Sequence, residues 1–177
     1  MPTRPTIALS LLAASALAGC QTVDEVPSAR LGQATLRLAN GLPGGTAQLL
    51  SAGSQVNISI ALAGISPGAH GVHLHAVGSC EAPDFTSAGG HLNPGNRQHG
   101  SDNPAGTHLG DLPNAMIGSG GAGTLSATLP GTRDDVLARI FDGDGTVIVV
   151  HADADDYRTD PTGNAGGRIA CGVFTRS

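Results

Sequence analysis

The chain has 177 residues with nine arginines, no lysine and 14 acidic residues, which gives a formal net charge of −5 at pH 7. The acidic balance and the lack of any basic cluster argue against nucleic acid as a partner. With three Phe, one Tyr and no Trp, the core must be aliphatic. The length predicts one domain, and the 27 glycines and 11 prolines favour short strands and turns over helices.

Residues 1–19 have the pattern of an export signal. One arginine precedes IALSLLAASALAG, an apolar run that is short for a membrane span. The run ends in LAGC, which resembles a bacterial lipobox and predicts cleavage before Cys20 and a lipid on that cysteine. A general secretory signal cleaved near Ala18 is the alternative. The signal predicts a protein of the bacterial periplasm that is attached to a membrane by its lipid. Because Gln21 rather than Asp follows the cysteine, we expect this to be the outer membrane.

Residues 20–33 are polar and are expected to form the lipidated N-terminus and a flexible tether. The predicted domain covers residues 34–177. Its clearest strand signal is SQVNISIALAGI, in which every second residue from Val56 to Leu62 is aliphatic.

Two long polar segments interrupt the predicted strands. Residues 78–113 have no hydrophobic periodicity, and DADDYRTDPTGNAGG forms a second loop at 153–167. Loops of such length are usually functional or disordered. Strand patterns return at NAMIGS, AGTLSATL, TVIVVHA and RIACGVF, whereas TRDDVLARIF is either a short helical turn or an irregular connection. About eight short strands predict an all-β antiparallel sandwich or barrel.

The chain has three cysteines. If Cys20 carries lipid, Cys80 and Cys171 remain, and in an oxidising compartment these two are expected to pair. Such a bridge would close a loop of roughly 90 residues, which the chain-entropy model values at about 4–5 kcal/mol.

All seven histidines lie between residues 70 and 151: His70, His73, His75, His91, His99, His108 and His151. Imidazole is the commonest metal ligand in proteins. On a strand, His73 and His75 would face the same side, while Leu74 would face the core. The pair predicts either a metal site or a solvated strand face.

The first long loop offers His91, His99, His108 and Asp111 within 21 residues. Three ring nitrogens and one carboxylate oxygen suit a tetrahedral zinc site. The alternative is a polar loop that is merely rich in histidine.

His151 ends an apolar strand and is a candidate third ligand beside His73 and His75. Asp155 follows four residues later and is suited to accept the second N–H of a ligating histidine. A ligand set made only of nitrogens suits copper, which favours imidazole.

Together, GAHGVHLHAVGSC, SAGGHLNP, HLGDLP, VVHADADD and GNAGGRIACGV resemble the exported bacterial Cu/Zn superoxide dismutases. The resemblance runs from about Ala34 to Phe174 in the order of the family. It implies an eight-stranded Greek-key β-sandwich or barrel of immunoglobulin-like architecture with two long functional loops.

The resemblance also implies a role for each position. The copper ligands would be His73, His75, His91 and His151; the zinc ligands would be His91, His99, His108 and Asp111, with His91 as the bridge between the metals. Asp155 would link a copper histidine to a zinc histidine, Arg168 would attract and orient the anion, and Cys80 would pair with Cys171. His70 is expected to be structural.

The implied activity is superoxide dismutation to O2 and hydrogen peroxide by alternate reduction and oxidation of the copper, with one copper and one zinc per chain. Arg168 and His91 would be the catalytic residues and zinc would be structural. The second loop has no lysine, so further steering charges are not evident, although Arg97 or Arg158 could serve. The oligomeric state, monomer or homodimer, stays open.

Two other functions remain as alternatives. One is a non-catalytic dismutase-like protein that binds copper and zinc in the envelope. The other is a zinc hydrolase, which is disfavoured because four protein ligands on zinc leave no position for a catalytic water.

Overall fold

The computed structural model describes residues 29–177, so the predicted signal peptide, the lipid on Cys20 and residues 20–28 of the predicted tether lie outside the described residues and stay predictions. Residues 30–33 were also expected in the tether, but they begin the first strand of the domain, where Arg30 pairs with Leu50. Within residues 29–177, no helix is both long enough and apolar enough to span a bilayer.

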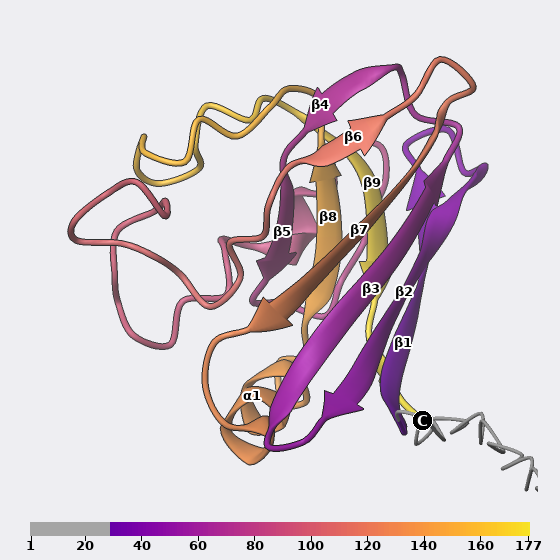
Figure 1. Ribbon diagram of the computed structural model, residues 1–177. Coiled ribbons are helices and arrows are strands. Elements are labelled where there is room, and N and C mark those ends of the chain that lie inside the picture. Colours follow the sequence, from indigo (N-terminus) through magenta and orange to yellow (C-terminus); the bar gives the residue numbers. More distant parts are fainter. Residues whose placement is uncertain (1–28) are drawn as a thin grey trace, which may run out of the picture.

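The described residues form an all-β, antiparallel structure in which one large sheet curls into a half-barrel (Figure 1). The strands are β1 (Arg30–Leu38), β2 (Pro43–Ala52), β3 (Gln55–Ala63), β4 (Gly68–His70), β5 (Val72–His75), β6 (Ala115–Ile117), β7 (Ala122–Leu129), β8 (Val147–His151), β9 (Arg168–Val173) and β10 (Thr175–Arg176). The large sheet has the order β5-β8-β9-β1-β2-β3-β7, with β10 paired to β1, and a second sheet contains only β4 and β6. The predicted fold class is therefore confirmed.

Strands β1 to β3 follow from the period-two pattern of the sequence. In β3 the side chains from Val56 to Leu62 alternate between buried and more exposed, because neighbouring residues of a strand face opposite sides. The strand pairs in continuous register with β2 on one side and β7 on the other.

Two apolar clusters lie on opposite faces of β8. The main core lies inside the half-barrel and includes Leu36, Ile58, Leu74 and Ile148. The smaller cluster contains Val147 and Val149 of β8 with Phe85, Ala88 and Cys171. Because His73 and His75 pair with Val149 and Val147, they share the outer face of the sheet, and that face is covered by loop residues.

The structure differs from the expectation of eight strands in two places. Gly71 separates β4 from β5, since its N–H donates to Asp153 of the second loop and its carbonyl accepts from His151. A short β10 adds to the edge of β1. TRDDVLARIF, expected as either a short helical turn or an irregular connection, contains helix α1 (Arg133–Ile140), which is capped by the Thr132 hydroxyl that accepts from the N–H of Asp135.

The two long loops, 76–114 and 152–167, lie on the same side of the molecule, beside β5 and β8 and away from β1 to β3 (Figure 1). They contact each other directly, since the N–H of Asp102 donates to the carbonyl of Tyr157 and the N–H of His99 donates to the carboxylate of Asp160. The first loop also contains a single 3-10 turn, Thr86–Ala88. The loops therefore form one wall over the histidine-bearing face of the sheet.

Candidate metal centre

Strands β5 and β8 place three histidines on the outer face of the sheet. His73 and His75 have no exposed surface, and His151 is 3 % exposed. The solvated strand face considered for His73 and His75 is therefore wrong. Leu74 between them packs in the main core, as expected from the alternation.

The first long loop completes this cluster by adding residues to the free edge of β5. Leu92 N donates to Leu74 O and Leu74 N donates to Gly110 O, so two separate parts of the loop meet the same strand. These contacts bring His91 opposite His75 and Asp111 opposite His73. One ligand atom from each of His73, His75, His91 and His151 then lies within 4.8 Å of the others.

A second cluster converges on one oxygen of Asp111. Its Oδ1 atom lies 3.0 Å from the Nδ1 atoms of His91, His99 and His108. A second group of ligand atoms that lie within 4.8 Å of one another comes from His73, His91, His99 and Asp111. The two clusters are thus adjacent, and the sequence-predicted zinc set of His91, His99, His108 and Asp111 lies together.

Five of the six clustered histidines use one ring nitrogen to contact an oxygen acceptor outside the cluster. The pairs are His73 Nε2 with Asp155 Oδ2 at 2.8 Å, His75 Nδ1 with Gly89 O at 2.9 Å, His151 Nδ1 with Gly166 O at 3.1 Å, His99 Nε2 with Asp155 Oδ1 at 3.0 Å and His108 Nε2 with Arg97 O at 3.1 Å. Donation from that nitrogen leaves the other one unprotonated and free to bind a metal.

His91 is the exception. Its Nδ1 faces Asp111 and His108, and its Nε2 is buried without a hydrogen-bond partner. The other buried ring nitrogens without a partner are His73 Nδ1, His75 Nε2 and His151 Nε2, whereas His99 Nδ1 faces only Oδ1 of Asp111, at 3.0 Å. Orphaned buried polar atoms are costly unless something binds them. Nitrogen atoms that converge in this way fit metal ions, and the mixed nitrogen and carboxylate set around Asp111 fits zinc.

Burial keeps the rings of His75, His91 and His151 neutral, as metal ligation requires. It lowers the pKa of His75 to about 2, that of His91 to about 4 and that of His151 to about 3, with repulsion from neighbouring histidines adding to the effect. Burial acts on His99 as well, but hydrogen bonds to Asp111 and Asp155 outweigh it and raise the pKa of His99 to about 9.

Asp155 contacts His73 of the first cluster and His99 of the second, one with each carboxylate oxygen. The close approach of the second loop depends on Gly163, which has φ of 65°. A Cβ atom on Gly163 would collide with the carboxylate of Asp155 and lie 2.6 Å from Nε2 of His99. Burial opposes ionisation of Asp155, but the hydrogen bonds from His73 and His99 hold its pKa below the usual range.

Arg168 begins β9 opposite His151. Its guanidinium donates to the carbonyls of Phe85 and Gly89, each at 2.6 Å. The disulfide Cys80–Cys171 is confirmed and joins the first loop to the same strand β9. Through that bridge the segment that holds Phe85 is fixed against the strand that holds Arg168.

His70 and Arg97 lie outside both clusters. The ring of His70 contacts the carbonyls of His151 and Ser66, at 2.8 and 2.9 Å, in keeping with a structural role. The guanidinium of Arg97 donates hydrogen bonds to the carbonyls of Ala105 and Gly106. Arg97, considered as a steering charge, is thus bound within the first loop.

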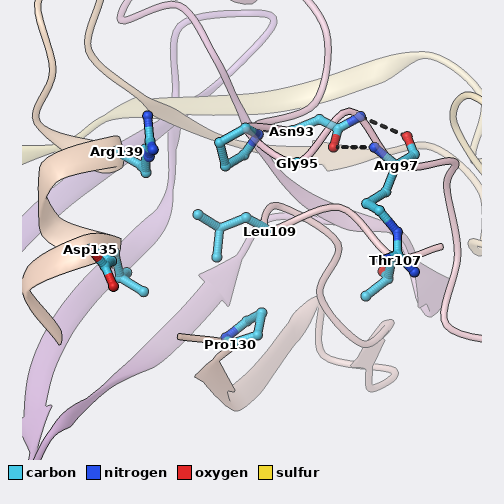
Figure 2. A pocket seen from close by; sticks show the side chains of 10 residues that line it. Asn93, Gly95, Arg97, Thr107, Leu109, Pro130, Asp135 and Arg139 are labelled. Atoms are coloured by element: carbon cyan, nitrogen blue, oxygen red, sulfur yellow. Dashed lines mark hydrogen bonds between the residues drawn. The ribbon is translucent and has the colours of Figure 1, made fainter. Parts of the chain in front are cut away.

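A pocket of about 360 Å³ lies between the first loop and helix α1 (Figure 2). On its loop side, Asn93 and Arg97 form the paired hydrogen bonds drawn in Figure 2, Asn93 Nδ2 to Arg97 O and Arg97 N to Asn93 Oδ1. Because Arg97 O contacts His108 Nε2, this turn also orients His108. None of the residues that line the pocket is a histidine.

Four contributors were not found from the sequence: Gly89, Asn114, Tyr157 and Gly163. Gly89 acts through its carbonyl and Gly163 through its lack of a side chain. Asn114 and Tyr157 contact Asp155 rather than a histidine. None of these actions has a signature in spacing or composition.

A curled antiparallel sheet whose loops enclose two adjoining clusters of histidine, one with a carboxylate, defines a protein with two neighbouring metal sites. The family model described as copper/zinc superoxide dismutase matches residues 44–174. The chain belongs to the copper/zinc superoxide dismutase family, whose metals are copper and zinc.

Relatives and solved structures agree with this assignment. The chain is 37 % identical over 176 residues to a Cu-Zn superoxide dismutase of Caulobacter vibrioides, covering 95 % of this chain and 99 % of that protein. It is 43 % identical over 122 residues to a superoxide dismutase-like protein of Bacillus subtilis, covering 67 % of this chain but only 62 % of that protein. The crystal structure of a SOD-like protein from Bacillus subtilis superposes with a TM-score of 0.76 at 38 % identity, covering 82 % of this chain and 99 % of that one.

Proposed function

We propose that this protein is a superoxide dismutase that binds one copper and one zinc per chain. The overall reaction converts two superoxide anions and two protons into O2 and hydrogen peroxide. Relatives named as Cu-Zn superoxide dismutases support the activity, including the Caulobacter protein, which matches over nearly its whole length.

The observation that carries the proposal is the position of His91 between the two clusters. Its Nε2 joins the nitrogens of His73, His75 and His151, and its Nδ1 joins His108 and Asp111. With no outside acceptor for either nitrogen, the ring is suited to lose its proton and bridge two cations, which stabilise the resulting anion.

The free ring nitrogens and the contacts of Asp111 Oδ1 support one set of ligand atoms. Copper would be held by His73 Nδ1, His75 Nε2, His91 Nε2 and His151 Nε2, and zinc by His91 Nδ1, His99 Nδ1, His108 Nδ1 and Asp111 Oδ1. His73 also lies near the second group, but its Nδ1 can serve only one metal and its Nε2 is engaged by Asp155.

Copper, when bound, supplies the one-electron exchange that oxidises one superoxide and reduces the next. Arg168, held beside His75, attracts the anion and orients it. His91 holds and releases a proton at Nε2 during turnover, and His75 and His151 keep their outer nitrogens on backbone carbonyls. Asp155 fixes the orientation of His73 and His99 together.

The alternative is a dismutase-like protein that binds copper and zinc without turnover. The printed name of the Bacillus relative, superoxide dismutase-like, keeps this alternative in view. Here all the predicted ligands converge and Arg168 is present, which favours the enzyme.

We also propose, from the sequence alone, that the domain is exported and anchored in the bacterial envelope by a lipid on Cys20, after removal of residues 1–19. The apolar run and the LAGC stretch support this. Mass spectrometry of the mature protein tests it, because an unmodified N-terminus near Gln21 or Ala18 would contradict it.

The function is tested by replacing His73 or His151 with alanine. We expect each variant to lose dismutation and copper while it keeps zinc, since the second cluster has its own set of donors. A matched control is Met116→Ala, because Met116 is 66 % exposed on β6, and its activity should equal that of the parent. Full activity of His151→Ala, or of protein stripped of copper, would refute the enzyme.

A further inference from the structure

The side-chain amide of Asn114 forms two hydrogen bonds with the backbone of Asp155. Oδ1 of Asn114 accepts from the N–H of Asp155 at 2.8 Å, and Nδ2 donates to the carbonyl of Asp155 at 2.9 Å. This pair of bonds has the donor and acceptor pattern of a paired strand. Asn114 immediately precedes β6 and follows Asp111 by three residues, so a regular sheet and the second cluster fix its position.

Asp155 needs such support because of where it lies. It belongs to the loop 152–167, in which the structure forms no strand or helix. Its buried carboxylate nevertheless has to meet His73 at 2.8 Å and His99 at 3.0 Å at the same time. A shift of its backbone would move both contacts together.

Tyr157 closes the arrangement into a ring of four hydrogen bonds, here called the Asn114–Asp155–Tyr157 ring. The N–H of Tyr157 donates to Oδ1 of Asp155 at 2.6 Å, and its hydroxyl accepts from the N–H of Asn114 at 2.7 Å. Tyr157 has φ of 59°, a left-handed backbone that a residue other than glycine adopts at a cost. The ring offsets this cost by satisfying polar groups that loop packing partly buries.

We propose that Asn114 is a positioning residue for both metal sites: through the Asn114–Asp155–Tyr157 ring it holds Asp155 so that one carboxylate orients His73 and His99 together. The inference rests on the proposed function, because it takes His73 as a copper ligand and His99 as a zinc ligand. According to this proposal, the orientation of a histidine in each site depends on the side chain of Asn114, which would contact neither metal.

The test compares Asn114→Ala, Asn114→Asp and Tyr157→Phe by zinc affinity of the metal-free protein, measured by competition with a chelator. Loss of such supporting contacts typically weakens metal binding about 10–100-fold, which is the result expected for Asn114→Ala. Asn114→Asp keeps the acceptor and loses the donor, so its affinity should fall between those of Asn114→Ala and the parent. Tyr157→Phe removes a single oxygen and should weaken binding by a smaller factor.

The second readout is spectroscopic. Cobalt(II) placed in the zinc site and copper(II) in the copper site should both show shifted visible absorption in Asn114→Ala, because His73 and His99 reorient together. Asn57→Ala is the matched control, since Asn57 accepts a bond from Thr128 between β3 and β7. Its zinc affinity and both spectra should equal those of the parent.

Zinc affinity and spectra of Asn114→Ala that match those of Asn57→Ala would overturn the proposal. If circular dichroism shows that Asn114→Ala does not fold, Tyr157→Phe decides, and an affinity equal to that of the parent overturns it. Failure of the proposed function is a separate result: the parent would bind both metals and respond to Asn114→Ala as described, yet would not dismute superoxide.

Discussion

Arg168 and His75 donate to the same acceptor, the carbonyl oxygen of Gly89, at 2.6 and 2.9 Å. The guanidinium is therefore fixed beside a ring whose other nitrogen is free for a metal. Arg168 also donates a hydrogen bond to the carbonyl of Phe85, which lies in the segment that follows the disulfide-bonded Cys80. A positive charge in a chain of net charge −5 is thus held beside a histidine of the first cluster.

Replacing Arg168 with glutamine should lower the rate constant for superoxide by about tenfold and weaken its dependence on ionic strength, since a fixed positive charge near the copper site is lost. Pulse radiolysis at several salt concentrations measures both quantities. Arg139→Gln makes the same change of charge on helix α1 and should leave them unaltered. An unchanged rate and salt response in Arg168→Gln would remove Arg168 from the mechanism.

Replacing Gly163 with alanine should weaken zinc binding and destabilise the protein by about 1–3 kcal/mol. The new Cβ atom would meet the Asp155 carboxylate and would also occupy a backbone with φ of 65°. Gly143→Ala is the control, because no atom lies within 4 Å of its added Cβ. Denaturant unfolding and zinc titration of both variants make the comparison, and equal behaviour would contradict the packing described for Gly163.

Removing the disulfide by the paired change of Cys80 and Cys171 to alanine should lower the free energy of unfolding by about 2–5 kcal/mol, because the bridge spans a separation of 91 residues. It should also slow turnover, since the segment with Phe85 would no longer hold Arg168. Guanidinium unfolding of the metal-free protein and the superoxide rate are the two measurements. A loss of stability with an unchanged rate would show that Arg168 is positioned without the bridge.

The period of the side chains and the spacing of the histidines predict much of this structure. Alternation in β3 and the apolar run of β8 locate the sheet, and the pairing of Cys80 with Cys171 follows from the odd cysteine count together with the predicted export signal. The break at Gly71 is not foreseeable, because it arises from hydrogen bonds to Asp153 and His151, far along the chain. The choice of ring nitrogen at each histidine likewise depends on backbone carbonyls, which no sequence pattern identifies.

The metal-free protein should be most stable near about pH 6.5, the ordinary pKa of histidine. The lowered pKa values of His75, His91 and His151 mean that the unfolded chain binds more protons as the pH falls below this value, so stability decreases toward about pH 4. The raised pKa of His99, about 9, acts in the opposite direction, and its contribution is lost as the pH rises toward that value. Unfolding midpoints at about pH 4.5, 6.5 and 8.5 check this, and midpoints that rise steadily on acidification would contradict it.

The most direct test of the account is metal analysis combined with a superoxide assay on the purified, oxidised domain. We predict one copper and one zinc per chain and dismutation that disappears when copper is removed and returns when copper is restored. A protein that binds both metals but does not accelerate dismutation, or that keeps its activity without copper, would contradict the account.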